Sequence, residues 1–138
     1  MKVEAITIGE SDALRPVDSV SAVAGKGLEG DRHFFAEGAR RGGAITLIEA
    51  EVLEDVGLGG PQSRRQVVTR GVRLNDLVGK RFFVGKIECE GVELCEPCLH
   101  LQSLTRPGII DDLLHRGGLN ADIVTSGKIS VGDTVTLT

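Results

Sequence analysis

The sequence has few aromatic residues and little charge bias. It contains no tryptophan, no tyrosine and only four phenylalanines among 138 residues, so its core must be built mainly from Val, Ile, Leu and Ala. The formal net charge of -4 gives no general attraction to nucleic acid, because duplex-binding proteins usually carry a basic balance or a clustered basic face. We therefore expect no nucleic-acid partner.

Long apolar runs are also missing. No stretch approaches the ~20 apolar residues that a membrane-spanning helix needs, and the opening Met1-Lys2-Val3-Glu4 lacks the charged-then-apolar layout of a signal peptide. We expect a cytoplasmic protein without a membrane partner. The chain length is that of one domain, so a single domain over residues 1–138 is expected.

Glycine, in contrast, is frequent, with 19 residues that separate short runs rich in Val, Ile and Thr. This pattern predicts many short strands. The predicted strands cover residues 2–8, 17–23, 44–48, 64–70, 82–84, 86–94, 121–125 and 128–138. The spacing of Ile48, Val52 and Val56 before Gly57 predicts one short helix, and an apolar stripe in 107–116 predicts another. We expect a mainly β protein, a closed or nearly closed β-barrel with two short helices.

All three cysteines and one of the three histidines lie within residues 89–100. An odd number of crowded cysteines does not form a disulfide framework, so we interpret them as reduced thiols. Thiolates and imidazoles attack sulfur, hold soft metals and exchange protons near neutral pH. This cluster is therefore the first candidate for a functional site.

Two interpretations of the cluster involve more than one cysteine. Cys89, Cys95, Cys98 and His100 together would supply four zinc ligands, although structural zinc sites usually join two distant ligand pairs. Cys95-x-x-Cys98 could also be a thioredoxin-like redox pair, but such a pair should open a helix, and residues 99–105 carry no helical start signal.

A third interpretation is a single reactive thiol at Cys98. Pro97 stiffens the approach to Cys98, and in an extended chain Cys98 and His100 would point to the same face. An imidazolium there would favour the thiolate, and Glu96 on that face would oppose it. Cys89 is better explained as a small apolar core residue. For Cys95, a buried apolar side chain and a functional thiol are equally good interpretations.

Several motifs recur in a recognisable order. They are Gly30-Asp-Arg-His33, Arg64-Arg-Gln-Val-Val-Thr-Arg, Cys95-Glu-Pro-Cys98, His115-Arg-Gly-Gly-Leu119 and Val131-Gly-Asp133. Over nearly the whole chain this order resembles the MOSC domain, the module named for the C-terminal part of molybdenum-cofactor sulfurases, in its small stand-alone bacterial form. The resemblance implies a barrel of the MOSC and pyruvate-kinase-barrel type. It also implies a cysteine, by motif Cys98, that carries sulfur as a persulfide or ligates the molybdenum of a pterin cofactor (molybdopterin).

The resemblance further implies a cleft around Cys98. Its candidate cofactor-binding residues are Asp31, Arg32, His33, Arg65, Gln66, Arg70, Cys95, His100 and Arg116. The arginines suit the terminal phosphate of a pterin cofactor, and His33 is either a catalytic proton donor or a loop cap. The sequence departs from similar proteins at Gln66, where Asn is frequent. His115 is explained by its predicted place in the last turn of a helix, where it faces the helix dipole.

Three functions stay open at this point. The first is binding of molybdenum cofactor or a related sulfur-bearing ligand, with a cysteine desulfurase or another sulfur donor as partner. The second is a molybdenum-dependent reductase for N-hydroxylated compounds, which would need separate redox partner proteins. The third is a non-catalytic barrel in which the cysteine cluster holds zinc for stability.

Overall fold

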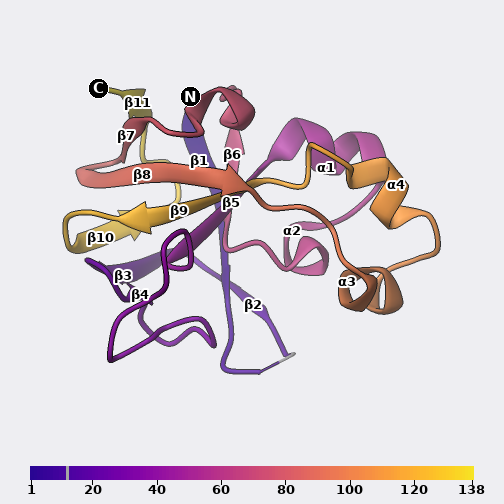
Figure 1. Ribbon diagram of the computed structural model, residues 1–138, viewed down its shortest axis with the longest axis horizontal. Coiled ribbons are helices and arrows are strands. Elements are labelled where there is room, and N and C mark those ends of the chain that lie inside the picture. The colour runs from indigo at the N-terminus through magenta and orange to yellow at the C-terminus, as the bar shows by residue number, and fades with distance from the viewer. Residues whose placement is uncertain (12) are drawn as a thin grey trace.

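Strands occupy one side of the molecule and helices the other in the computed structural model, which describes residues 1–11 and 13–138 (Figure 1). The strands are β1 (Lys2–Ile8), β2 (Arg15–Val17), β3 (Ser19–Val23), β4 (Gly27–Leu28), β5 (Ile45–Glu49), β6 (Val67–Arg70), β7 (Arg81–Val84), β8 (Ile87–Leu94), β9 (Leu119–Ile123), β10 (Gly127–Ser130) and β11 (Val135–Leu137). The helices are α1 (Ala50–Val56), α2 (Gly60–Ser63), the 3₁₀ turn η1 (Leu74–Leu77), α3 (Leu99–Leu104) and α4 (Ile109–Leu113). No helix in the described ranges has the length and apolar character needed to cross a membrane.

Eight strands form one curled sheet in the order β11-β7-β8-β9-β5-β6-β1-β2, and β10, β3 and β4 form a second sheet. The two sides of the large sheet meet where Lys2 pairs with Thr134 in an isolated antiparallel bridge. The Val3 amide also donates to the Asp133 carbonyl at 2.8 Å. The prediction of a mainly β protein is therefore confirmed, but the barrel is not fully closed. β1 meets the turn that precedes β11, so the contact stays a single bridge without a ladder.

The main core fills the inside of this curl. It contains fully buried aliphatic side chains from both sheets, such as Ile6, Leu47 and Ile129, together with Phe82. Cys89 belongs to this core and lies opposite Phe82 in the β7–β8 ladder, as the sequence predicted. A separate apolar cluster joins the helices, formed by Val52, Val56, Leu101, Ile109 and Leu113.

Several predicted elements are confirmed in type but differ in length. β1 has the predicted bounds, and the helix before Gly57 is α1, with Gly57 in the left-handed conformation at φ 75°. The predicted strand 64–70 begins only at Val67, because α2 occupies Gly60–Ser63 and Arg64 has a positive φ of 62°. The expectation of two helices was wrong, since the described residues contain four α-helices and one 3₁₀ turn.

The missed helix α3 matters most for function. It has no side-chain cap at its first turn, so no start signal marks this helix in the sequence. Its Leu101 is only 2% exposed and packs with Ile109 and Leu113 of α4. Tertiary packing therefore stabilises α3, and Cys98 becomes its N-cap residue. The extended chain that would place Cys98 and His100 on one face of a strand is therefore not formed, because His100 lies in α3.

Candidate functional site

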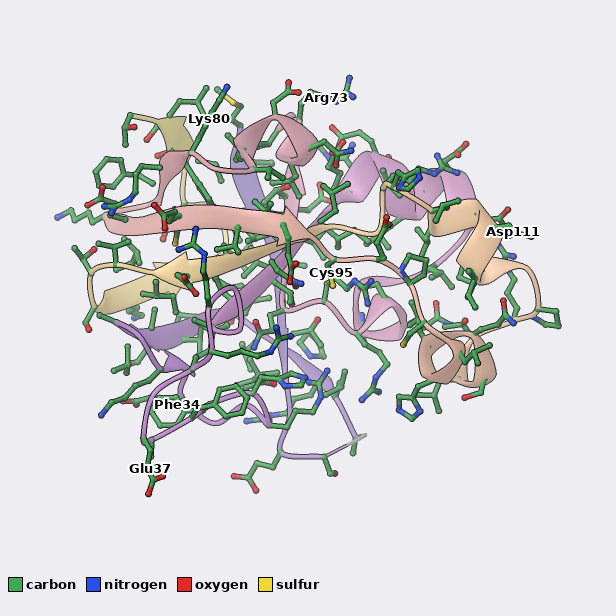
Figure 2. The ribbon with its side chains drawn as sticks, viewed as in Figure 1. Phe34, Glu37, Arg73, Lys80, Cys95 and Asp111 are labelled. Atoms are coloured by element: carbon green, nitrogen blue, oxygen red, sulfur yellow. The ribbon has the colours of Figure 1, made fainter. Side chains whose placement is uncertain are left out.

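The thiol loop, residues 95–98, connects the end of β8 to the start of α3. Figure 2 shows Cys95 just beyond the end of β8. The Cys95 amide donates to the Gly118 carbonyl at 2.8 Å. A Cβ placed on Gly117 would lie 2.4 Å from the Cys95 carbonyl oxygen and 3.3 Å from Pro97 Cδ. Glycine at position 117 therefore lets the thiol loop pack directly on the backbone that precedes β9.

The Arg65 side chain holds the thiol loop in place through hydrogen bonds to backbone carbonyls. Its side chain is buried, at 7% exposure, and its Nε donates to the Gly117 carbonyl at 2.7 Å. Nη2 donates to the Cys95 carbonyl at 3.0 Å and Nη1 to the Ser63 carbonyl at 3.3 Å. One guanidinium thus connects α2, the thiol loop and the segment before β9. Arg65 does line the pocket described below, and its contact with a cofactor stays a prediction.

A second tie to the thiol loop comes from His115. The carboxylate of Glu96 accepts hydrogen bonds from the His115 amide and lies within hydrogen-bonding distance of His115 Nδ1, both at 2.7 Å. His115 lies outside α4, which ends at Leu113, and has a left-handed φ of 63°. Its predicted position in the last turn of a helix was wrong. The structure gives it a different task, which is to hold Glu96 of the Cys-Glu-Pro-Cys motif.

The three cysteines are free thiols in three different environments: Cys89 is buried, Cys95 intermediate and Cys98 exposed. Burial raises the pKa of Cys89 to about 12, which leaves it an inert core side chain. Burial also raises the pKa of Cys95, although the charge of Arg65 opposes that shift. Cys98 is the thiol that an external reactant reaches first.

Asp31 organises the opposite wall of the site. Its buried carboxylate accepts from the amides of Gly9 and His33, each at 3.1 Å, and from Arg32 Nη1 at 3.2 Å. Gln66 Nε2 donates to the same carboxylate at 2.6 Å. Asp31 therefore fixes the loop that carries Arg32 and His33.

Gln66 connects this loop to the large sheet. While its amide nitrogen binds Asp31, its Oε1 accepts from the Thr46 amide of β5 at 2.9 Å. The side chain is almost fully buried, at 2% exposure. The longer side chain of Gln66 lets it bind both Asp31 and Thr46. This explains structurally why Gln occupies a position where the resemblance led us to expect Asn.

These walls enclose a pocket of about 160 Å³, called the thiol pocket below. It is lined by Arg32, His33, Thr46, Arg64, Arg65, Cys95, Cys98, His100 and Leu101. An adjoining inner pocket of about 230 Å³ shares His33, Thr46 and Cys95 and adds Phe35, Arg40, Gly42, Gly43, Gln66 and Asn120. Seven of the predicted site residues, Arg32, His33, Arg65, Gln66, Cys95, Cys98 and His100, therefore line one continuous cleft, and Asp31 holds its wall.

Arg32, Arg40, Arg64 and Arg65 line the cleft, and Asp31 offsets part of their charge through its ion pair with Arg32. Desolvation lowers the pKa of His33, and the charges of Arg32, Arg64 and Arg40 lower it further, while Asp31 opposes the shift. The lowered pKa favours the neutral form of the His33 imidazole. Arg64 was not among the predicted site residues, although its place in the Arg64-Arg65 pair was a usable signal. Arg64 has a left-handed backbone conformation. Its side chain lines the thiol pocket, whereas the side chain of Arg65 binds backbone carbonyls.

Two predicted arginines lie elsewhere. Arg70 pairs with Glu4 at 2.5 Å and with Glu54 at 2.8 Å. Arg116 pairs with Asp55 at 2.7 Å and lines a different pocket, next to Glu49 and Arg73. The structure does not bring either guanidinium to the thiol pocket.

The four proposed zinc ligands do not converge. Cys89 lies in the core of the curled sheet, whereas Cys98 and His100 are exposed at the helix side. Across residues 1–11 and 13–138, no three His, Cys, Asp or Glu side chains are grouped closely enough to hold a metal ion. The geometry therefore gives no support to a zinc site built from this cluster.

Comparison with solved structures identifies the fold. The YuaD protein of Bacillus subtilis superposes with a TM-score of 0.80 at 18% identity, covering 97% of this chain and 93% of that one. YiiM of Geobacillus stearothermophilus gives a TM-score of 0.75 at 15% identity, over 99% of this chain and 74% of that one. YiiM of Escherichia coli gives 0.71 at 18% identity, over 100% and 70%.

Sequence comparison adds nothing to this, because no family model and no curated protein matches the chain. At such low identities the structural likeness speaks for the fold alone. The chain has the fold of the YuaD and YiiM structures, consistent with the MOSC-like fold that its motifs predicted.

Proposed function

We propose that this protein is a sulfur-handling domain that binds molybdenum cofactor or a related sulfur-bearing ligand. In it, the Cys98 thiol either carries sulfur as a persulfide or ligates the metal. The observation that carries the proposal is the position of Cys98. It is the exposed thiol of the three and stands at a cationic pocket on a loop held at both ends.

The charge of the pocket suits an anionic occupant. Arg32, Arg64 and His100 line it together with Cys98. A thiolate, a persulfide and a phosphate are all anions that guanidinium groups stabilise through charge-assisted hydrogen bonds. The lowered pKa of His33 favours its neutral form, in which one ring nitrogen can accept a proton.

The residues of the pocket also fit the cofactor that the resemblance implies. A soft thiolate is the ligand type that a sulfur-rich metal centre prefers. Cys98 would hold the metal, and Arg32 and Arg64 would hold the terminal phosphate. When bound, the cofactor supplies a metal centre that accepts sulfur or exchanges electrons. Arg65 contributes by fixing the Cys95 carbonyl, and thereby the loop that presents Cys98.

Loading of Cys98 with sulfur needs an external persulfide donor and no other cysteine of this chain. The Cys98 thiolate attacks the outer sulfur of a persulfide on a cysteine desulfurase, the sulfur–sulfur bond of the donor breaks, and the donor cysteine leaves as a thiolate. The exposure of Cys98 permits this approach. The fixed backbone of the thiol loop keeps the new persulfide at the mouth of the pocket, beside the cationic side chains.

The test combines mass spectrometry with elemental analysis. The purified protein is incubated with a cysteine desulfurase and cysteine, and the Cys98 peptide is examined for an added sulfur atom. In parallel, protein isolated from cells that make molybdenum cofactor is analysed for molybdenum and pterin. We expect at least one of these signals in the wild type and in Cys95→Ser, and its loss in Cys98→Ser. Absence of both signals from the wild type would refute the proposal.

A further inference from the structure

We propose that Cys95 is the resolving thiol of this site: it releases sulfide from a Cys98 persulfide and leaves a Cys95–Cys98 disulfide. The inference rests on the proposed function, specifically on its sulfur-carrier form. It assigns a chemical task to a second cysteine that the carrier role does not need.

The first support is the position of the two thiols in one pocket. Cys95 and Cys98 both line the thiol pocket and are separated by Glu96 and Pro97 alone. Cys89 is buried in the core of the curled sheet and takes no part.

The second support is the difference in solvent exposure between the two thiols. Cys98 is exposed at the start of α3, where a donor protein reaches it, while Cys95 is largely withdrawn from solvent. The Cys95 backbone is held on both sides, since its amide donates to Gly118 and its carbonyl accepts from Arg65. A thiol in this position is shielded from external reactants but remains available to its neighbour.

The third support is the location of the inner pocket. Cys95 lines this pocket as well as the thiol pocket, so it stands at the junction between them. The inner pocket also presents Arg40 and Asn120, whose side chains carry N–H donors that suit a small anion. Cys95 therefore lies between the exposed thiol of Cys98 and a pocket with N–H donors for a small anion.

The chemical step balances without a hidden reactant. Cys95 gives up its proton, its sulfur attacks Sγ of Cys98, and the bond from that Sγ to the outer sulfur breaks. The outer sulfur leaves with the electron pair as HS⁻. Two thiol sulfurs are thereby oxidised to a disulfide while the carried sulfur is reduced to sulfide. A dithiol reductant of the thioredoxin class then supplies two electrons and two protons to restore both thiols.

This step would solve a problem of a single-cysteine carrier. An acceptor that needs sulfide, and not a sulfane sulfur, requires two electrons at the moment of transfer. Cys95 provides them from within the protein, at a high effective concentration. Burial disfavours its thiolate, which protects the loaded state from immediate discharge.

The experiment follows the fate of a loaded persulfide. Wild type, Cys95→Ser and Cys95→Ala are loaded with a desulfurase and cysteine, freed of both, and sampled over time for sulfide and for the persulfide on the Cys98 peptide. Peptide mapping without reductant looks for the Cys95–Cys98 link. Cys89→Ala serves as the matched control because it removes a thiol but leaves the pocket intact, and circular dichroism checks that each variant is folded.

We expect wild type and Cys89→Ala to release sulfide in step with formation of the Cys95–Cys98 disulfide. Both Cys95 variants should keep the persulfide at least about tenfold longer, because they lack the intramolecular attacker. Equal rates of discharge in wild type and Cys95→Ser would overturn the inference while the carrier function stands. Failure of any variant to take sulfur on Cys98 would also overturn it, and molybdenum content would then decide the proposed function separately.

Discussion

Replacement of Arg65 by methionine removes a guanidinium that donates to three backbone carbonyls, those of Ser63, Cys95 and Gly117. Methionine preserves most of the apolar stem, so the loss comes mainly from carbonyls left without a partner in a buried place. An unsatisfied buried acceptor costs about 1–3 kcal/mol, and these losses are not additive. Because the losses are not additive, we expect Arg65→Met to lower the free energy of unfolding by more than the cost of one carbonyl but less than a simple sum, roughly 2 kcal/mol.

Urea unfolding followed by circular dichroism measures this change, since the chain has no tryptophan or tyrosine to serve as a fluorescent probe. Arg65→Lys should lose part of the stability, because an ammonium group cannot reproduce the planar fork that reaches three carbonyls. Arg41→Met is the control. Arg41 is exposed, and its ion pair with Glu90 is long, at 3.6 Å. Its loss should therefore change stability by less than about 0.5 kcal/mol. If Arg65→Met were as stable as this control, the structural role assigned to Arg65 would be wrong.

Three further predictions concern the neighbourhood of Cys98. Gly117→Ala should destabilise the fold by about 1–3 kcal/mol in urea unfolding, because the new methyl group meets the Cys95 carbonyl. Gly60→Ala should be neutral, because its Cβ would make ordinary contacts, with Val68 at 3.5 Å and Thr7 at 3.8 Å. Gln66→Asn should lose one of the contacts to Thr46 and Asp31 and cost about 1 kcal/mol in the same assay, and unchanged stability would contradict that account. The NMR titration of His33 should lie below the 6.5 of an ordinary histidine, and Arg40→Gln should raise it. Because folding lowers this pKa, the folded state binds fewer protons, so stability decreases as pH falls through that range; a midpoint above 6.5 would contradict the prediction.

Local patterns predicted a large part of this fold. The β-branched run of β1 and the apolar spacing before Gly57 depend on short-range geometry, and both elements are found where expected. Helix α3 could not be predicted in this way. Its stability comes from Leu101 packing against α4, a contact between segments whose relative placement the sequence does not state.

The candidate site shows the same division. Composition and spacing singled out Cys98 and placed Cys89 in the core, since those arguments rest on local surroundings. The arginines were harder, because a guanidinium binds whatever the fold brings near it. Arg70 and Arg116 pair with surface carboxylates, and Arg65 holds carbonyls. Arg64, which the sequence arguments passed over, lines the thiol pocket.

His115 is a further case in which the tertiary structure decides the role. Its predicted place in a helix followed from the apolar stripe before it, but α4 ends at Leu113. The residue then turns through a left-handed conformation to meet Glu96, far away in the sequence. A pair of this kind leaves no mark in local periodicity.

The central claim is that Cys98 is the sulfur-reactive residue of this domain. Peptide-resolved mass spectrometry of the wild-type protein, taken at the earliest times after exposure to a loaded cysteine desulfurase, tests it most directly. The account predicts that the added sulfur is found first on the peptide position of Cys98 and that none is taken up by Cys98→Ser. Sulfur that appears first on Cys95, or uptake that persists in Cys98→Ser, would contradict it.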